Sequence, residues 1–171
     1  MSSRPSSRSP IWDDLALAWE EFLIYHQRTW NKCEALYRGT RYWPRLAGKY
    51  VPRRKTDPVL LYVHHARHVD EHGIAPVTEP QAPTTTVTSG SIAGGSVIVG
   101  GGDSFLAAGS SAGIKINPAT VVARAVTNRN QLYTPPQLAG YTGDTPVLAI
   151  AIEAIKFYDD LFADLDAAGA P

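Results

Sequence analysis

The stretch "DPVLLYVHHARHVDEHG", residues 57–73, decides the fold because it carries both the start and the end of a helix. Asp57 before Pro58 is typical of a capping residue followed by proline at the first helical position, and Gly73 is a natural C-terminal stop. The apolar residues between them recur at spacings of three and four: Val59, Tyr62, Val63, Ala66 and Val69. Residues 57–72 are therefore predicted to form a helix with one buried face.

Two further helices are predicted from the same kind of start. A Ser-Pro pair opens residues 10–37, whose stripe is Trp12, Leu15, Trp19, Phe22, His26, Trp30, Cys33 and Tyr37. Thr145 before Pro146 opens residues 145–167, whose stripe is Val147, Leu148, Ala151, Ile155, Tyr158, Leu161, Phe162 and Leu165. Three helices of this length make a small bundle.

Residues 74–144 have a different character. A Pro-rich connector is followed by "TTTVTSGSIAGGSVIVGGG" (84–102), which is typical of two short strands with turn glycines, and "TVVARAVTN" (120–128) predicts a further strand. The Gly-rich part lacks the G-x-x-x-x-G-K-[ST] pattern of a nucleotide-binding loop. The expected fold class is α+β: a single domain over residues 1–171, with a small helical bundle and a β-rich insertion before the C-terminal helix.

Composition and charge narrow the classes of partner. The formal net charge is zero, but residues 1–72 hold twelve Lys and Arg against eight Asp and Glu, and residues 73–171 hold four against eight. A polyanionic partner is expected to meet the first half. Cys33 is the only cysteine, which excludes an internal disulfide framework. With no apolar leader and no stretch of about 18 apolar residues, a soluble, cytoplasmic protein without a membrane partner is expected.

Residues 38–55 form a basic stretch without an acidic residue. Its cations and interleaved aromatic residues are Arg38, Arg41, Arg45, Lys49, Arg53, Arg54, Lys55, Tyr42 and Trp43. Phosphates attract such cations, and unstacked bases lie on such rings, so the mixture suits single-stranded RNA. The alternative is a solvated loop between two helices whose aromatic side chains fill the core.

Histidines gather on the helix predicted over residues 57–72. On a helical wheel His65, His68 and His72 share one face, with His64 beside it, and the spacing of His68 and His72 suits a metal ion such as Zn²⁺. Such a site needs a further ligand, and His26 is a candidate. The alternative for His26 is a hydrogen-bonded core residue.

Arg67 and His72 form an R-x4-H motif near the end of this helix, after a long amphipathic first helix. Residues 10–73 thereby resemble the HEPN superfamily of small α-helical bundles. The resemblance implies a metal-independent ribonuclease without a cofactor, commonly with its site at a dimer interface. Arg67 would bind the scissile phosphate, and His72 would act as acid or base. The residue after the motif arginine is often Asn in the family; here it is His68, which retains the capacity to hydrogen-bond.

Two alternatives remain open at this stage. On a regular helix Arg67 and His72 point about 140° apart, so a single phosphate reaches both only with a distorted turn or a second subunit. A homodimer is therefore expected for the ribonuclease. One alternative is a non-catalytic interaction or assembly protein, in which the bundle displays a β-hairpin to an unidentified protein partner. The other is a metal-dependent protein that uses the histidine face.

Overall fold

The computed structural model describes the chain apart from a few short segments and one longer one; the described residues are 10–88, 113–117, 119–141 and 143–170. The chain divides into two compact units: a helical unit formed by Met1–Pro80 and Val121–Pro171, and a smaller unit, Gln81–Thr120. The predicted β-rich insertion, residues 74–144, is therefore divided: residues 74–80 and 121–144 belong to the helical unit, and residues 81–120 form the smaller unit. The α+β class predicted from the sequence is confirmed.

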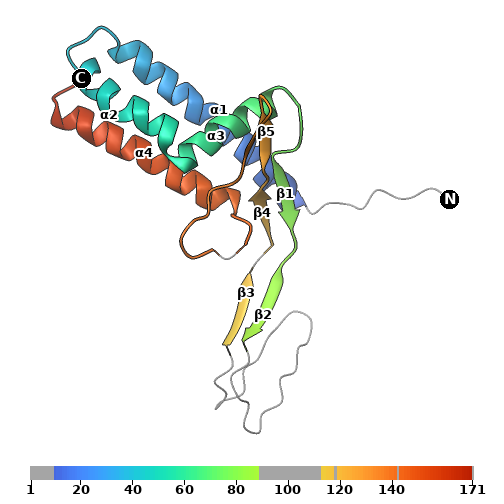
Figure 1. Cartoon of the computed structure of the whole chain (residues 1–171). Helices are drawn as coiled ribbons and strands as arrows, with labels where there is room; N and C mark the ends of the chain where they lie inside the picture. Colours follow the sequence, from blue (N-terminus) through green and yellow to red (C-terminus); the bar gives the residue numbers. More distant parts are fainter. Residues whose placement is uncertain (1–9, 89–112, 118, 142, 171) are drawn as a thin grey trace. The chain divides into compact units, whose positions relative to one another are not determined.

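Four helices form the bundle of the helical unit (Figure 1): α1 Pro10–Tyr37, α2 Trp43–Thr56, α3 Pro58–Glu71 and α4 Val147–Ala167. Helix α3 contacts each of the other three. The predicted helices over residues 10–37, 57–72 and 145–167 are confirmed, with α3 capped by Asp57 and ended by His72. The Ser9 cap of α1 lies outside the described residues.

Helix α2 corrects the prediction of three helices and the reading of residues 38–55 as a loop. Pro44 and Pro52 argue against a helix in a propensity count, as Gly48 does. Pro44 lies in the first turn, where proline is tolerated, whereas Pro52 lies inside the helix. Leu46 and Tyr50, four residues apart, are both buried in the core. Tertiary packing of this apolar pair therefore outweighs the weak propensity.

The core is one aromatic-rich cluster between the helices. The largest fully buried side chains are Trp19, Tyr50, Tyr62, Phe157, Leu23, Ile150, Leu161, Val63, Val69 and Val121. The buried faces predicted for α1 and α3 are confirmed in the main, with Trp19, Trp30, Tyr62 and Val69 all in this cluster.

The buried face predicted for α4 is partly wrong. Leu148, Ile155 and Phe162 were predicted to face the core, yet they are 61%, 46% and 44% exposed. The face that packs is instead Val147, Ala149, Ile150, Ala154, Phe157, Tyr158, Leu161 and Leu165. The first half of α4 is apolar around most of its circumference, so periodicity alone does not select the buried side.

The start of α4 also differs from the prediction. Pro146, in extended conformation, is the residue before the helix, and the helix begins at Val147. The hydroxyl of Thr145 is buried and donates a hydrogen bond of 2.9 Å to the carbonyl of Pro136 rather than capping the helix. Thr145 therefore anchors the preceding loop to the bundle.

Among the described residues, six short strands pair two by two: β1 Thr78–Gln81, β2 Thr84–Thr88, β3 Gly113–Asn117, β4 Thr120–Ala123, β5 Val126–Asn128 and β6 Gln131–Tyr133. Strand β1 pairs with β4, β2 pairs with β3 in antiparallel register, and β5 pairs with β6 in a tight hairpin. The single strand predicted over residues 120–128 is two strands, and the predicted turn glycines beyond residue 88 lie outside the described residues. Across the described ranges, no helix is long and apolar enough to cross a membrane.

Candidate functional site

Helix α3 presents its polar residues by burying the opposite face. The Asp57 carboxylate accepts hydrogen bonds from the backbone N–H groups of Val59 at 2.9 Å and Leu60 at 3.3 Å, which fixes the first turn. With its apolar face in the core, the helix leaves the side chains predicted to be functional exposed or half-buried: His64, His65, Arg67, His68 and His72. The sequence prediction and the structure agree on which face is available.

Arg67 is held on the helix surface by an ion pair. Its guanidinium donates to the Glu71 carboxylate at 3.1 Å, one turn later, and its side chain is 27% exposed. The Nε atom is buried and, within the described part of the chain, has no hydrogen-bond partner. No hydrogen bond joins Arg67 to His72 among the described residues. The arginine is therefore charged, half-buried and partly unsatisfied.

His68 and His72 lie against each other at the end of α3. Their ring centroids are 4.5 Å apart with an interplanar angle of 75°, an edge-on contact. His72 ends the helix, and Gly73 follows with φ of +58°, a left-handed conformation that favours glycine. The structure thus brings together two of the three predicted catalytic residues.

His65 is occupied by the β5–β6 hairpin. The Asn128 side-chain amide donates to Nδ1 of His65 at 2.9 Å, and the ring of Tyr133 stacks on the imidazole at 3.5 Å. Arg129 and Asn130 form the hairpin turn with φ of +51° and +63°, as a two-residue turn of this kind requires. Desolvation first, and then the neighbouring cations, lower the pKa of His65 to about 4, so the ring is neutral at pH 7.

His64 marks a convergence of positive charge on this side of α3. Desolvation lowers its pKa, and the charges of Arg54, His68, Arg67 and Arg129 lower it further. These groups come from α2, α3 and the β5–β6 turn, and the sequence did not predict that Arg129 belongs with them. We call this set of Arg54, His64, Arg67, His68 and Arg129 the α3 cationic cluster.

Three of the seven cations in the basic stretch face α4 instead. Lys49 lies 2.7 Å from the Asp164 carboxylate, Arg53 lies 2.6 Å from Asp160, and Arg45 lies 4.0 Å from Asp164. The Tyr50 hydroxyl donates to the same Asp164 carboxylate at 2.8 Å, and hydrogen bonds from Lys49 and Tyr50 lower the pKa of Asp164. These carboxylates neutralise the α4-facing side of α2.

The beginning of the basic stretch is engaged within its own neighbourhood. Arg38 pairs with Glu34, and Arg41 donates to the Tyr42 hydroxyl at 2.9 Å. Tyr42 and Trp43 are partly buried against the core. The Tyr42 hydroxyl donates to the Gly169 carbonyl at 2.9 Å. That these two rings stack on RNA bases stays a prediction.

Arg54 and Lys55 have a different environment from the rest of α2. The Arg54 guanidinium lies over the Trp30 ring at 4.4 Å and donates to the Gln27 side-chain carbonyl at 2.9 Å. Both cations line a pocket together with His64 and His65. The fold therefore divides the predicted RNA-binding set into a side neutralised by α4 and an end that joins the histidines of α3.

The histidines of α3 and His26 are not arranged as the ligands of one metal ion among the described residues. Within the described residues, no group of three or more His, Cys, Asp and Glu side chains is placed to hold a metal ion. His26 packs between Phe22 at 5.6 Å and Tyr158 at 5.0 Å, and it is 6% exposed. Desolvation first, and then Arg54, lower the pKa of His26 to about 4. His26 is a core histidine, as the second interpretation expected, but its Nε2 has no hydrogen-bond partner among the described residues.

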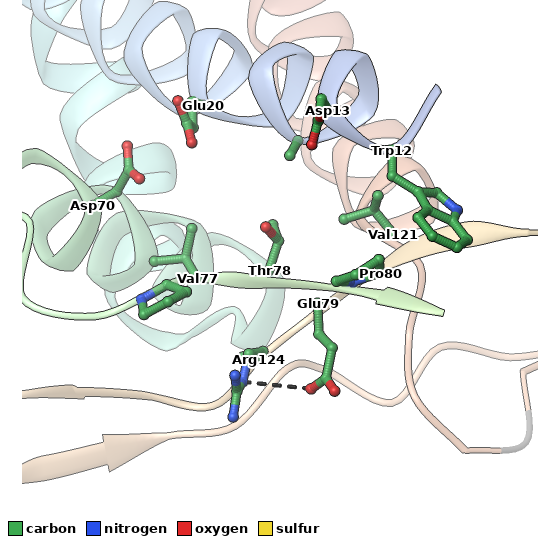
Figure 2. Close-up of a pocket in the computed structure, with 12 residues that line it drawn as sticks. Trp12, Asp13, Glu20, Asp70, Val77, Thr78, Glu79, Pro80, Val121 and Arg124 are labelled. Atoms are coloured by element: carbon green, nitrogen blue, oxygen red, sulfur yellow. Dashed lines mark ion pairs between the residues drawn. The ribbon is translucent and has the colours of Figure 1, made fainter. Parts of the chain in front are cut away.

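A separate acidic pocket of about 420 Å³ lies beside β1. Figure 2 shows Glu20 from α1 and Asp70 from α3 on one side of β1, whereas Glu79 points to the other side and pairs with Arg124 at 3.6 Å. Desolvation raises the pKa of Glu20 and of Asp70, and the Asp70 charge raises that of Glu20 further. The negative charge makes this pocket unsuitable for RNA. Because its carboxylates come from distant segments, no local sequence pattern indicates it.

No family model matches the chain, and no curated protein and no solved structure matches it.

Proposed function

We propose that the protein is a HEPN-like RNA-binding protein that cleaves single-stranded RNA without a metal ion, through Arg67 and His72. The observation that carries the proposal is the α3 cationic cluster, because it places positive charge beside imidazoles on the exposed side of one helix. Cations attract the phosphate backbone, and imidazoles exchange protons near neutral pH. The lone Cys33 and the RNA partner fit a cytoplasmic location, which is part of the proposal.

The chemistry needs only the groups of this face. Arg67 binds the scissile phosphate and stabilises the negative charge that develops on it. The RNA 2′-hydroxyl attacks phosphorus, its proton passes to a base, and the 5′-oxygen leaves with a proton from an acid. His72 fills one of these two proton-transfer roles, and His68, in contact with its ring, hydrogen-bonds to it or to the substrate. The products are a 2′,3′-cyclic phosphate and a 5′-hydroxyl.

A second copy of the chain completes this site in the proposal. Arg67 is tied to Glu71, and His72 lies beyond the helix end about 140° further round on a regular helix. In a homodimer that pairs α3 with its symmetry mate, Arg67 of one protomer meets His72 of its partner. The homodimer therefore supplies the convergence that one chain lacks.

The test is cleavage of single-stranded RNA in excess EDTA. We expect Arg67→Ala and His72→Ala to abolish cleavage, while Arg28→Ala, which removes an exposed arginine 6.0 Å from the centre of the Tyr25 ring, leaves the rate unchanged. Activity that EDTA removes and Zn²⁺ restores contradicts the proposal in favour of the metal-dependent alternative. Equal rates in wild type and Arg67→Ala contradict it as well.

Mixing the two inactive variants tests the composite site. Subunit exchange between Arg67→Ala and His72→Ala produces heterodimers with one intact site, so about a quarter of wild-type activity returns if protomers mix at random. A site within one chain regains nothing on mixing. This result separates a shared site from a local one without a new structure.

A second candidate function is a non-catalytic interaction or assembly protein. Four large apolar side chains follow one exposed stripe of α4, Leu148, Ile152, Ile155 and Phe162, with exposed fractions of 61%, 52%, 46% and 44%. An apolar stripe of this kind is typical of a protein-binding surface. In this candidate the bundle is a scaffold and the β2–β3 hairpin is displayed to a protein partner.

The stripe also gives the test of the second candidate. Ile152→Glu is expected to disrupt the association of the protein with copies of itself, measured by sedimentation. Glu153→Gln, beside it on the same helix, is expected to leave this association intact. If Ile152→Glu neither changes the sedimentation coefficient nor improves solubility, the stripe is not a binding surface and this candidate fails. RNA cleavage by the Ile152→Glu protein would place the function on α3 alone.

A further inference from the structure

A pocket of about 350 Å³ lies between α1, α2 and α3, away from the acidic one; its lining residues are Trp30, Glu34, Val51, Arg54, Lys55, Leu61, His64 and His65. Two permanent cations and two imidazoles thus share one hollow. Glu34 is the only carboxylate among the lining residues, and Arg38 compensates its charge. The local balance of charge is positive.

Arg54 is the cation of this pocket that an anionic ligand would stabilise most. It is half-buried, stacked on Trp30 and hydrogen-bonded to the neutral amide of Gln27. Among the described residues no carboxylate lies within ion-pair distance of its guanidinium, and burial lowers its pKa more than the charges of Tyr158 and Glu34 raise it. A half-buried cation without a counter-ion costs free energy that an anion offsets on binding. Stacking on the Trp30 ring leaves the edge of the guanidinium, which carries its donors, as the binding side.

The neighbours of Arg54 are arranged as donors. Lys55 is exposed, with no ion pair among the residues that the structure describes. Because Nδ1 of His65 accepts from Asn128, the proton of the neutral ring is on Nε2, which leaves an N–H donor. His64 lies beside it, with ring centroids 5.1 Å apart. A guanidinium, an ammonium and imidazole N–H groups are the donors that bind tetrahedral oxyanions.

We propose that this pocket binds a phosphate group, with Arg54 as the principal contact and Lys55, His64 and His65 as supporting donors. The inference goes beyond RNA cleavage, because inorganic phosphate alone is a sufficient ligand. The phosphate belongs either to a free nucleotide or phosphate ion or to an RNA chain, and all of these present the same oxygens.

Binding is expected to depend on pH. The groups that face His64 and His65 are Glu34 from α1, Arg54 and Lys55 from α2, Arg67 and His68 from α3, and Arg129 and Tyr133 from the β5–β6 hairpin. Desolvation first, and then the neighbouring positive charges, lower the pKa of both imidazoles. A bound dianion raises the pKa of both rings, so affinity rises as pH falls. Sulfate is the probe for this arm, since its charge does not change between pH 5 and pH 8.

Isothermal titration calorimetry at constant ionic strength, balanced with NaCl, tests the inference. Inorganic phosphate and sulfate are expected to bind wild type saturably, and Arg54→Gln to weaken binding by roughly tenfold. The matched control is Arg53→Gln, which removes the adjacent cation that pairs with Asp160, and it is expected to bind as wild type does. Thermal melts establish that each variant is folded, and Lys55→Gln, at an exposed position, provides a second variant should Arg54→Gln be unstable.

Two RNA oligonucleotides distinguish the source of the phosphate. If only the 5′-phosphorylated form competes with inorganic phosphate, the pocket takes a terminal phosphate; if the 5′-hydroxyl form of the same sequence competes equally, it takes backbone phosphates. Phosphate binding without RNA binding supports this inference and contradicts the RNA function. Absence of saturable phosphate and sulfate binding, or equal affinity in wild type and in folded Arg54→Gln and Lys55→Gln, overturns the inference while leaving RNA cleavage through Arg67 open.

Discussion

Arg53 and Arg54 are neighbours in the sequence and have opposite surroundings in the fold. Arg53 lies 2.6 Å from the Asp160 carboxylate on α4, and hydrogen bonding to Asp160 raises its pKa. Arg54 lies over Trp30 without a carboxylate partner among the described residues, and burial lowers its pKa. Arg53 turns towards α4 and supports the bundle, whereas Arg54 contacts Trp30 and Gln27 of α1 and lines the pocket that also contains His64 and His65.

This difference between neighbouring residues shows that a basic stretch of sequence does not by itself predict a binding surface, because carboxylates from another helix can neutralise its cations. Arg45, Lys49 and Arg53 follow one another at intervals of four, and Asp160 and Asp164 on α4 have the same interval. Two helices in contact match such intervals with ion pairs. Within α2, Arg54 and Lys55 lie outside this register, and both line the pocket that also contains His64 and His65.

The largest expected effect tests whether the α4-facing side of α2 is structural. Tyr50 is fully buried, and its hydroxyl donates to the Asp160 carbonyl at 2.7 Å and to the Asp164 carboxylate. Tyr50→Ala is expected to lower the free energy of unfolding by about 3–5 kcal/mol, and Tyr50→Phe by about 1 kcal/mol. Urea denaturation measures both. A loss below about 1 kcal/mol for Tyr50→Ala would mean that α2 is not anchored through this side.

The next effect separates the core histidine from the surface histidines. Because the folded-state pKa of His26 is about 4, against about 6.5 in the unfolded chain, the unfolded state binds more protons between these values. The contribution of His26 to stability is therefore expected to fall by up to about 3 kcal/mol as pH decreases from 6.5 to 4. His26→Phe should flatten this dependence in urea denaturation at several pH values. Parallel curves for wild type and His26→Phe would contradict the assignment of His26 to the core.

The smallest effect concerns the ion pair on the structural side. Arg53 and Asp160 are partly exposed, so their coupling in a double-mutant cycle with alanine is expected to be below about 1 kcal/mol. Thermal denaturation at low and high salt measures it, and salt should reduce it. A coupling of several kcal/mol would show that the pair is the main anchor, in place of the buried Tyr50.

The sequence predicts α1, α3 and α4 because a polar residue before proline coincides with an apolar period in each of them. It misses α2, because the prolines and cations of this segment outweigh the signal of its two buried residues, Leu46 and Tyr50. It also predicts Leu148, Ile155 and Phe162 to be buried, because α4 is apolar on two sides. The sequence offers Arg67, His68 and His72 as candidate site residues because they share one local motif. It does not offer Arg129, since only the β5–β6 hairpin brings this residue to α3.

The most direct test of the division between the two sides is RNA affinity in two double variants that remove the same charge. Fluorescence anisotropy with a single-stranded RNA compares Arg54→Gln/Lys55→Gln with Lys49→Gln/Arg53→Gln over a series of salt concentrations. We expect the first pair to weaken binding at least tenfold and to reduce the salt slope by about 1.4, as the loss of two phosphate contacts implies. The second pair should stay within about threefold of wild type with an unchanged slope. Equal losses in the two variants, or a larger loss in the second, would contradict the account.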